Sequence, residues 1–190
     1  MLFRSKELSK EADIFVLDAF GTAHRAHAST VGVASFIPAY SGILLNYEVE
    51  MLEKLLKSPK SPFLAIIGGS KVSSKINVLK NLLKSVDRLF IGGAMAFTFL
   101  KAQGLNVGKS LFEPEYLEVA SDFLKEAARL DKTVVLPLDQ LVVEDIDKDK
   151  NPQLVNINEI PDEKLGVDVG PKTIKIVEEM VRQRSEEHTS

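Results

Sequence analysis

Short apolar runs alternate along the chain with segments in which apolar residues recur every three or four positions. The short runs are typical of strands buried on both faces, and the three-to-four spacing is typical of amphipathic helices. Their alternation predicts parallel strands with right-handed helical crossovers, which is an α/β, doubly wound, Rossmann-like architecture. The expected buried strands are residues 14–17, 63–67, 88–91 and 133–136.

A helical pattern over residues 41–57 ends where proline occurs twice within six residues, in the segment 57–62. Proline disfavours helix both at its own position and at the residue before it, so this segment is the best candidate for a boundary. A long helix that ends in such a linker suits a connection between two domains. The apolar stripe of the helix is Leu44, Tyr47, Met51 and Leu55.

Composition narrows the class of protein. The 190 residues are 45% hydrophobic and 27% charged, with a net charge of −3 and no basic block, so nucleic acid is not an expected partner. Cysteine is absent, which excludes disulfides and thiolate metal sites. No apolar run approaches the length of a membrane span, and the start of the chain lacks a secretion signal. A cytoplasmic location is therefore expected.

The strand expected at 63–67 runs into Gly68 and Gly69, where a side chain would block a ligand from approaching the backbone. Ser70 is expected to cap a helix that begins at once, with Lys71 and Lys75 on one face of its first turn. Two cations at that end oppose the helix dipole, and a bound phosphate would resolve the conflict. The alternative is two solvated lysines, and neither standard phosphate fingerprint fits the segment.

A second candidate site follows the strand expected at 14–17. His24, Arg25 and His27 crowd four positions after a turn, and the planar fork of Arg25 suits a carboxylate or a phosphate. A metal would need a third ligand, and none is near in sequence, so no metal site is assigned. A solvated turn is the alternative. The preceding strand favours a ligand site, because ligands of open α/β sheets bind at strand tips.

Later segments repeat the combination of strand and glycine. Gly92 and Gly93 follow the strand expected at 88–91, which suggests two neighbouring strand tips. Residues 142–143 and 154–157 are expected to pair as a hairpin, and 165–173 are interpreted as a glycine-rich turn. A final helix is expected from Pro171, with Ile174, Val177 and Val181 buried.

Together these segments resemble phosphoglycerate kinase over nearly the whole chain. Residues 18–27 look like that family's substrate-loop motif, and 68–75 look like its nucleotide-phosphate motif. Residues 91–96 and 166–171 are similar to its nucleotide-pocket turns. Four motifs in the family's order make chance agreement very improbable.

The resemblance implies a domain organisation. Residues 1–40 would be the C-terminal part of the acid-binding domain, 41–61 the connecting helix and linker, and 62–183 a partial nucleotide-binding domain. The implied activity is a glycolytic, reversible transfer of a phosphoryl group between ATP and 3-phosphoglycerate, with Mg²⁺, by a monomer.

The resemblance also implies roles for individual residues. Arg25 and His24 match residues that hold 3-phosphoglycerate. Lys75 matches the lysine that stabilises the transferring phosphoryl group, and Lys71 matches its partner on the nucleotide phosphates. The nucleotide pocket backbone would be formed by Gly69, Ser70, Gly93, Ala94 and Gly166. Leu17, Ser70, Ser74 and Ala94 depart from the family's usual residues, and the methyl group of Ala94 is expected to crowd the nucleotide.

The family is about twice as long as this chain, and its early and late substrate loops are missing here. The chain is therefore expected to be an internal piece of the enzyme that is inactive alone. The alternative is a noncatalytic α/β nucleotide-binding or interaction module. Residues 184–190 are polar and match a translated sequencing adapter, so we expect them to be a non-native tail.

Overall fold

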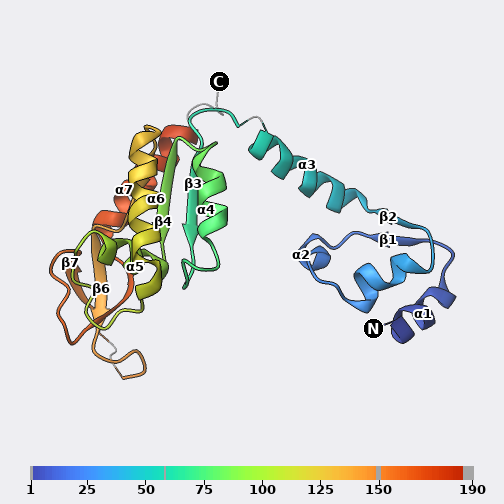
Figure 1. Ribbon diagram of the computed structural model, residues 1–190, viewed down its shortest axis with the longest axis horizontal. Helices are drawn as coiled ribbons and strands as arrows, with labels where there is room; N and C mark the ends of the chain where they lie inside the picture. The colour runs from blue at the N-terminus through green and yellow to red at the C-terminus, as the bar shows by residue number, and fades with distance from the viewer. Residues whose placement is uncertain (1, 58, 149–150, 186–190) are drawn as a thin grey trace. The chain divides into compact units, whose positions relative to one another are not determined.

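The computed structural model describes residues 2–57, 59–148 and 151–185 (Figure 1). Residues 186–190 of the expected non-native tail lie outside the described residues. The chain divides into two compact units, unit 1 (Met1–Ser58) and unit 2 (Pro59–Ser190). Both contain parallel strands connected through helices, which confirms the predicted α/β class. Among the helices within the described ranges, none combines the length and apolar character needed to cross a membrane.

Unit 1 is built on a parallel sheet of two short strands, β1 and β2, with Phe15 opposite Ala39 and Leu17 opposite Ser41. Strand β2 was not predicted, because its three residues carry no apolar run. The elements are α1 (Leu2–Leu8), η1 (Ser9–Glu11), β1 (Phe15–Leu17), α2 (Phe20–Ala23), η2 (Ala28–Gly32), η3 (Val33–Ser35), β2 (Ala39–Ser41) and α3 (Ile43–Lys57).

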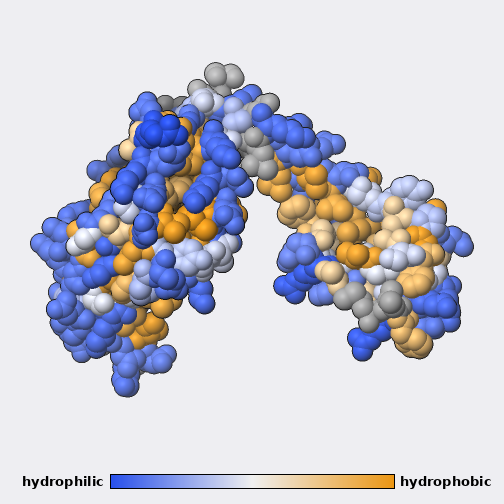
Figure 2. Space-filling view, in the orientation of Figure 1, coloured by the Kyte–Doolittle hydropathy of each residue, from blue (hydrophilic) through white to orange (hydrophobic). Residues whose placement is uncertain are grey.

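The apolar surface of unit 1 is more exposed than the pattern predicted. Val16 of β1 is 55% exposed, so the expectation of a strand buried on both faces was wrong. Leu44, Tyr47 and Met51 of α3 are also exposed. Figure 2 shows hydrophobic residues in orange along this helix. The side chain of Leu55 lies outside the described residues. Within unit 1, the described elements leave these side chains uncovered.

The start of α3 is fixed by a residue from another element. The Asp18 Oδ1 atom accepts a hydrogen bond of 2.8 Å from the backbone N–H of Leu45, which lies in the first turn. Gly42 lets the carboxylate approach, since a Cβ built there would lie 2.2 Å from the Asp18 Cγ atom. An acidic side chain at this end also complements the helix dipole. The helix therefore begins two residues after the predicted Ser41.

Unit 2 contains two sheets. A parallel sheet has the order β3-β4-β5, and an antiparallel sheet has the order β7-β6-β8. The predicted hairpin is the β6–β7 pair. Residues 165–169 form strand β8 rather than the predicted turn, because they pair with β6. The strands are β3 (Leu64–Gly68), β4 (Arg88–Gly92), β5 (Thr133–Val135), β6 (Asp139–Val143), β7 (Gln153–Asn156) and β8 (Leu165–Val169).

The main core of unit 2 lies on one face of the parallel sheet. Side chains from β3 and β4 pack there against the helices, and Phe99 meets Phe123 edge to face with ring centroids 5.7 Å apart. The helices of the unit are α4 (Ile76–Leu83), α5 (Met95–Ala102), η4 (Pro114–Tyr116), α6 (Leu117–Arg129) and α7 (Pro171–Ser185).

The opposite face of this sheet is only partly covered. Ile66 of β3 is 50% exposed, so the prediction that this strand is buried on both faces was wrong. Helix α7 begins at Pro171 as predicted, but Ile174 and Val181 are exposed. Thr173 and Met180 are its buried residues instead. The period of α7 was identified correctly, whereas the face it buries was not.

Asp139 ties the first turn of α7 to strand β6. Its carboxylate accepts hydrogen bonds from the backbone N–H groups of Lys172 and Thr173 and from the Thr173 hydroxyl, at 2.6–2.9 Å. Asp139 is buried. Burial raises the pKa of its carboxyl group, but the bonds from Thr173 and Lys172 outweigh this, and the pKa lies below its ordinary value. The folded chain therefore holds Asp139 ionised.

We expect the substitution Asp139→Asn to destabilise unit 2 by about 2–3 kcal/mol at pH 7, because it removes a charged acceptor from buried donors. A pKa lowered by folding stabilises the protein above the unfolded pKa of about 4, and this contribution is lost as pH falls through the folded pKa. The difference between wild type and variant should therefore be constant from pH 7 to pH 5 and shrink below about pH 4. Urea unfolding across this range measures it. Asp122→Asn on the surface of α6 is the control, and equal losses in both variants would contradict the tie.

Candidate functional site

Two glycine pairs meet at the tips of β3 and β4. The strands run in parallel register from Leu64 opposite Arg88 to Gly68 opposite Gly92, which confirms the predicted neighbouring tips. Gly93 has a φ of +67°, and a Cβ built there would lie 2.7 Å from the carbonyl oxygen of Gly69. The same carbonyl accepts a 2.9 Å hydrogen bond from the N–H of Met95 at the start of α5. Only glycine at position 93 permits this backbone contact.

Residues 70–75, which we call the lysine loop, connect the β3 tip to α4. The predicted helix start at Ser70 was wrong, because α4 begins at Ile76. Val72 is fully buried and its carbonyl accepts the N–H groups of Lys75 and Ile76, so the backbone turns there before the helix forms. Lys71 therefore lies in the loop and Lys75 at the helix N-cap, rather than together on one helical face.

Lys75 lies along the first glycine pair with its charge exposed. A Cβ built at Gly69 would lie 3.9 Å from the Lys75 Cε atom, which places the aliphatic stem beside this glycine. Among the described residues, no carboxylate forms an ion pair with Lys75. Helix α4 begins directly after Lys75, and helix α5 begins shortly after the tip of β4, so the dipoles of both helices add positive potential. The arrangement suits an anion.

Three other predicted residues share one small cavity. Gly93, Ala94 and Gly166 line a space of about 110 Å³ at the edge of the antiparallel sheet. Gly166 has a packing reason of its own, since a Cβ there would lie 2.4 Å from the Phe97 Cζ atom. The remaining lining residues are Phe97, Gln140, Val167, Asp168 and Val169.

Gln140 is a site residue that the sequence analysis missed. It is 3% exposed and lines the cavity of Gly93, Ala94 and Gly166. Within the described residues its side-chain amide forms no hydrogen bond, so a donor and an acceptor stay available to a ligand. The sequence offered no signal for it, because the residue matters only through the pairing of β6 with β8.

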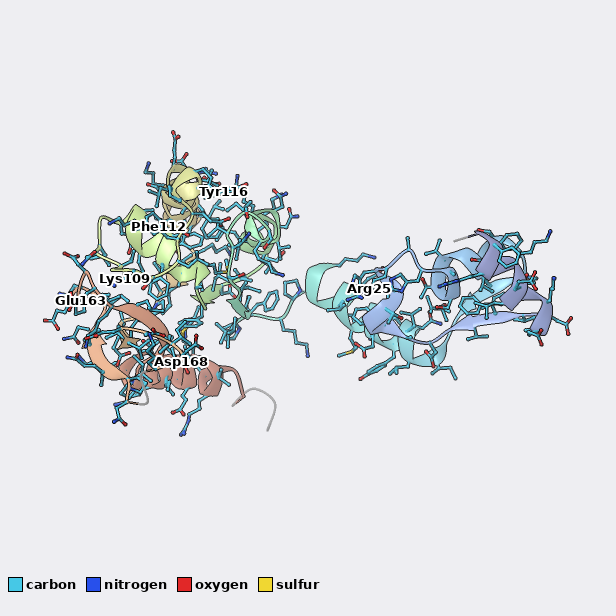
Figure 3. All side chains as sticks on the ribbon, turned by 90° about the horizontal axis from the view of Figure 1, so that it is seen from below. Arg25, Lys109, Phe112, Tyr116, Glu163 and Asp168 are labelled. Carbon is cyan, nitrogen blue, oxygen red and sulfur yellow. The ribbon has the colours of Figure 1, made fainter. Side chains whose placement is uncertain are left out.

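In unit 1, His24 and Arg25 are adjacent and exposed, with Arg25 labelled in Figure 3. The Arg25 Nε–H donates to the His24 Nε2 atom at 3.3 Å, which leaves the two terminal nitrogens of the guanidinium for an anion. Thr30, which was not predicted, fixes the turn. Its buried hydroxyl donates to the carbonyl of Arg25 at 2.6 Å and accepts from the N–H of His27 at 3.1 Å.

The architecture defines an α/β protein of the doubly wound class, in which ligands bind at the carboxyl ends of parallel strands. The sequence profile of the phosphoglycerate kinase family matches residues 4–186. The chain belongs to the phosphoglycerate kinase family.

Individual relatives agree with this assignment. The chain is 54% identical over 177 residues to the phosphoglycerate kinase of Borrelia hermsii, covering 93% of this chain and 45% of that protein. It is 49% identical over 179 residues to that of Finegoldia magna, covering 94% and 45%. The solved phosphoglycerate kinase structure from Coxiella burnetii superposes with a TM-score of 0.75 and 45% identity, covering 91% of this chain and 45% of that one. The chain thus spans a little under half the length of these relatives.

We expect Gly93→Ala to destabilise unit 2 by about 2 kcal/mol or more, because it combines a left-handed backbone with a clash against the backbone of Gly69. Gly68→Ala is the matched control, since nothing lies within 4 Å of a Cβ built there. It should change stability by less than about 0.5 kcal/mol. Urea unfolding gives the energies, and the amide chemical shift of Met95 reports whether its bond to Gly69 survives. A tolerated Gly93→Ala would show that the two tips do not constrain each other.

Proposed function

We propose that this chain supplies the nucleotide-phosphate site and part of the 3-phosphoglycerate site of a phosphoglycerate kinase. The enzyme would transfer a phosphoryl group reversibly between ATP and the carboxylate of 3-phosphoglycerate. The observation that carries the proposal is the position of Lys75. Its side chain lies beside Gly69 at the paired strand tips, and its exposed ammonium group forms no ion pair with a carboxylate of the described residues. Family membership and this geometry support the same reaction.

The proposed roles follow from where each group lies. Phosphoryl transfer depends on positioning and on stabilising negative charge rather than on covalent catalysis. Lys75 would stabilise the transferring phosphoryl group and Lys71 would bind the nucleotide phosphates, because both charges flank the buried anchor Val72. The backbone at Gly69, Ser70, Gly93, Ala94 and Gly166 would form the walls of the nucleotide pocket.

The 3-phosphoglycerate would contact unit 1. The open guanidinium nitrogens of Arg25 suit two oxygens of one phosphate or carboxylate, and His24 adds a second polar contact. In this proposal unit 1 contributes to the acid-binding domain, α3 is the connecting helix, and unit 2 is the larger part of the nucleotide domain.

In this proposal Mg²⁺ accompanies the nucleotide. Within the described residues, no three carboxylate or imidazole side chains gather as metal ligands. Glu113, the acidic residue bonded to the lysine loop, is engaged with Ser73. We therefore assign no protein ligand to the ion. Mg²⁺ commonly binds through substrate phosphates and water with few protein ligands, so it would arrive with ATP or ADP.

Lys75→Ala tests the proposal in two settings. In the 190-residue chain, we expect weak binding of MgADP by the wild type, on the order of millimolar, and loss of about tenfold in affinity in the variant. In a complete phosphoglycerate kinase that contains this segment, turnover should fall on the order of 10²-fold, because the charge acts mostly in the transition state. Calorimetry and a coupled assay measure the two effects.

Lys80→Ala, at an exposed position near the end of α4, is the control for general loss of positive charge. An equal loss of affinity in both lysine variants would argue against a specific phosphate site. The expectation that the 190-residue chain has no turnover alone stays a prediction, and turnover by that purified chain would contradict it.

A further inference from the structure

The segment 110–113 bridges the two ends of the candidate site in unit 2. At one end, the Ser110 hydroxyl accepts a 2.9 Å hydrogen bond from the N–H of Gly166. At the other end, Glu113 contacts the lysine loop through Ser73. Lys109, Phe112 and Tyr116 are labelled along this stretch of chain in Figure 3, ahead of α6. The motifs that resemble the kinase family do not include the segment.

Glu113 holds Ser73 at two points. Its Oε2 atom accepts the Ser73 N–H at 3.0 Å, and its Oε1 atom accepts the Ser73 hydroxyl at 2.6 Å. Glu113 is itself fixed to α5, because its own N–H donates to the hydroxyl of Thr98 at 3.1 Å. Thr98 is 1% exposed, so this anchor is buried in the core. Glu113 therefore connects the lysine loop, through its carboxylate, with helix α5, through its backbone N–H.

The lysine loop has no side-chain cap of its own. Lys75 occupies the N-cap position of α4 with no side-chain hydrogen bond to the helix. The side chain of Val72 is buried in the core of unit 2 and anchors the loop there, and Glu113 holds the adjacent residue, Ser73. Lys71 precedes this fixed pair and Lys75 follows it closely. Free movement of Ser73 would therefore move both ammonium groups.

We propose that Glu113 is a positioning residue that holds the lysine loop in the conformation that presents Lys71 and Lys75 to phosphate. The inference rests on the proposed function for its link to nucleotide, whereas the tie itself stands on geometry. The positioning role also explains why a carboxylate lies beside a proposed anion-binding site.

The charge of Glu113 makes the positioning role testable, because a positioning effect and a purely electrostatic effect would change nucleotide affinity in opposite directions. Burial raises the pKa of Glu113, but the hydrogen bonds from Ser73 and the charge of Lys71 outweigh it, and the net pKa lies below its ordinary value. Glu113 is thus ionised at neutral pH and repels a bound nucleotide. Removing its charge should strengthen nucleotide binding if the carboxylate acts through charge alone, and weaken it if the carboxylate positions the loop.

The first measurement uses the ligand-free chain. We expect amide hydrogen exchange at Ser73 to accelerate on the order of tenfold in Glu113→Gln, because a charged acceptor is replaced by a weaker one. Ser73→Ala removes only the hydroxyl bond and should give a smaller change at the neighbouring amides. Glu115→Gln, two residues away and exposed, should change nothing. Unchanged exchange at Ser73 in Glu113→Gln would overturn the tie.

The second measurement is MgADP binding to the same variants at two ionic strengths. Glu113→Gln should lose about three- to tenfold in affinity, Glu113→Asp should recover part of it, and Glu115→Gln should match the wild type. Unchanged or tighter binding by Glu113→Gln, with exchange at Ser73 accelerated, would overturn the positioning role.

If the wild-type chain binds no MgADP, the proposed function fails, and the exchange rates alone decide whether Glu113 holds the loop. If Glu113→Gln does not fold, Ser73→Ala decides in its place, and unchanged exchange and affinity there would overturn the proposal.

Discussion

The parallel pairing of β3 with β4, kept in register to their final glycines, is the constraint on which the rest of unit 2 depends. Because Gly68 lies opposite Gly92, strands β3 and β4 end at the same level of the sheet, and the residues that follow them, Gly69 and Gly93, are in close contact. The carbonyl of Gly69 can then receive the first N–H of α5, and the lysine loop must begin beside that helix. Shifting one strand by one residue would separate the tips and move the side chains of that strand to the opposite face of the sheet. The positions of Lys75 and Ala94 follow from this pairing.

The sequence predicted those features of the fold that depend on neighbouring residues. Apolar runs and helical spacing identified β3, β4 and β5 and the helices α3 and α7, because each pattern is complete within its own segment. It failed where a distant residue decides. Residues 165–169 became a strand only through β6, and the loop before α4 is bonded to Glu113, which lies 40 residues from Ser73. Burial was overestimated for Val16 and Ile174, because a pattern shows which face is apolar but not whether anything covers it.

The candidate site divides in the same way. The sequence could offer Lys71, Lys75, Arg25 and the glycines as candidates, because glycine pairs and clustered cations are recognisable in a single stretch of sequence. Other residues became visible only in three dimensions, because each acts through a partner from another part of its unit. Gln140 faces glycines from two other segments, and Thr30 holds the backbone of Arg25 from the following helical turn. Isolated polar residues within apolar or mixed segments carry no comparable local signal. These residues are Gln140, Glu113, Asp139 and Thr30.

The contact between Gly93 and Gly69 has a consequence for how this sequence can evolve. Crowded positions in a core often change in pairs, because a smaller side chain at one site makes room for a larger one at the other. That route is closed here, since a side chain at 93 would meet the backbone nitrogen and oxygen of residue 69, which every amino acid carries. No substitution at position 69 can therefore compensate for a side chain at position 93. Gly93 could be replaced during evolution only if the backbone of the whole turn changed its conformation first. Gly68, one residue away, is under no such epistatic restriction from its surroundings.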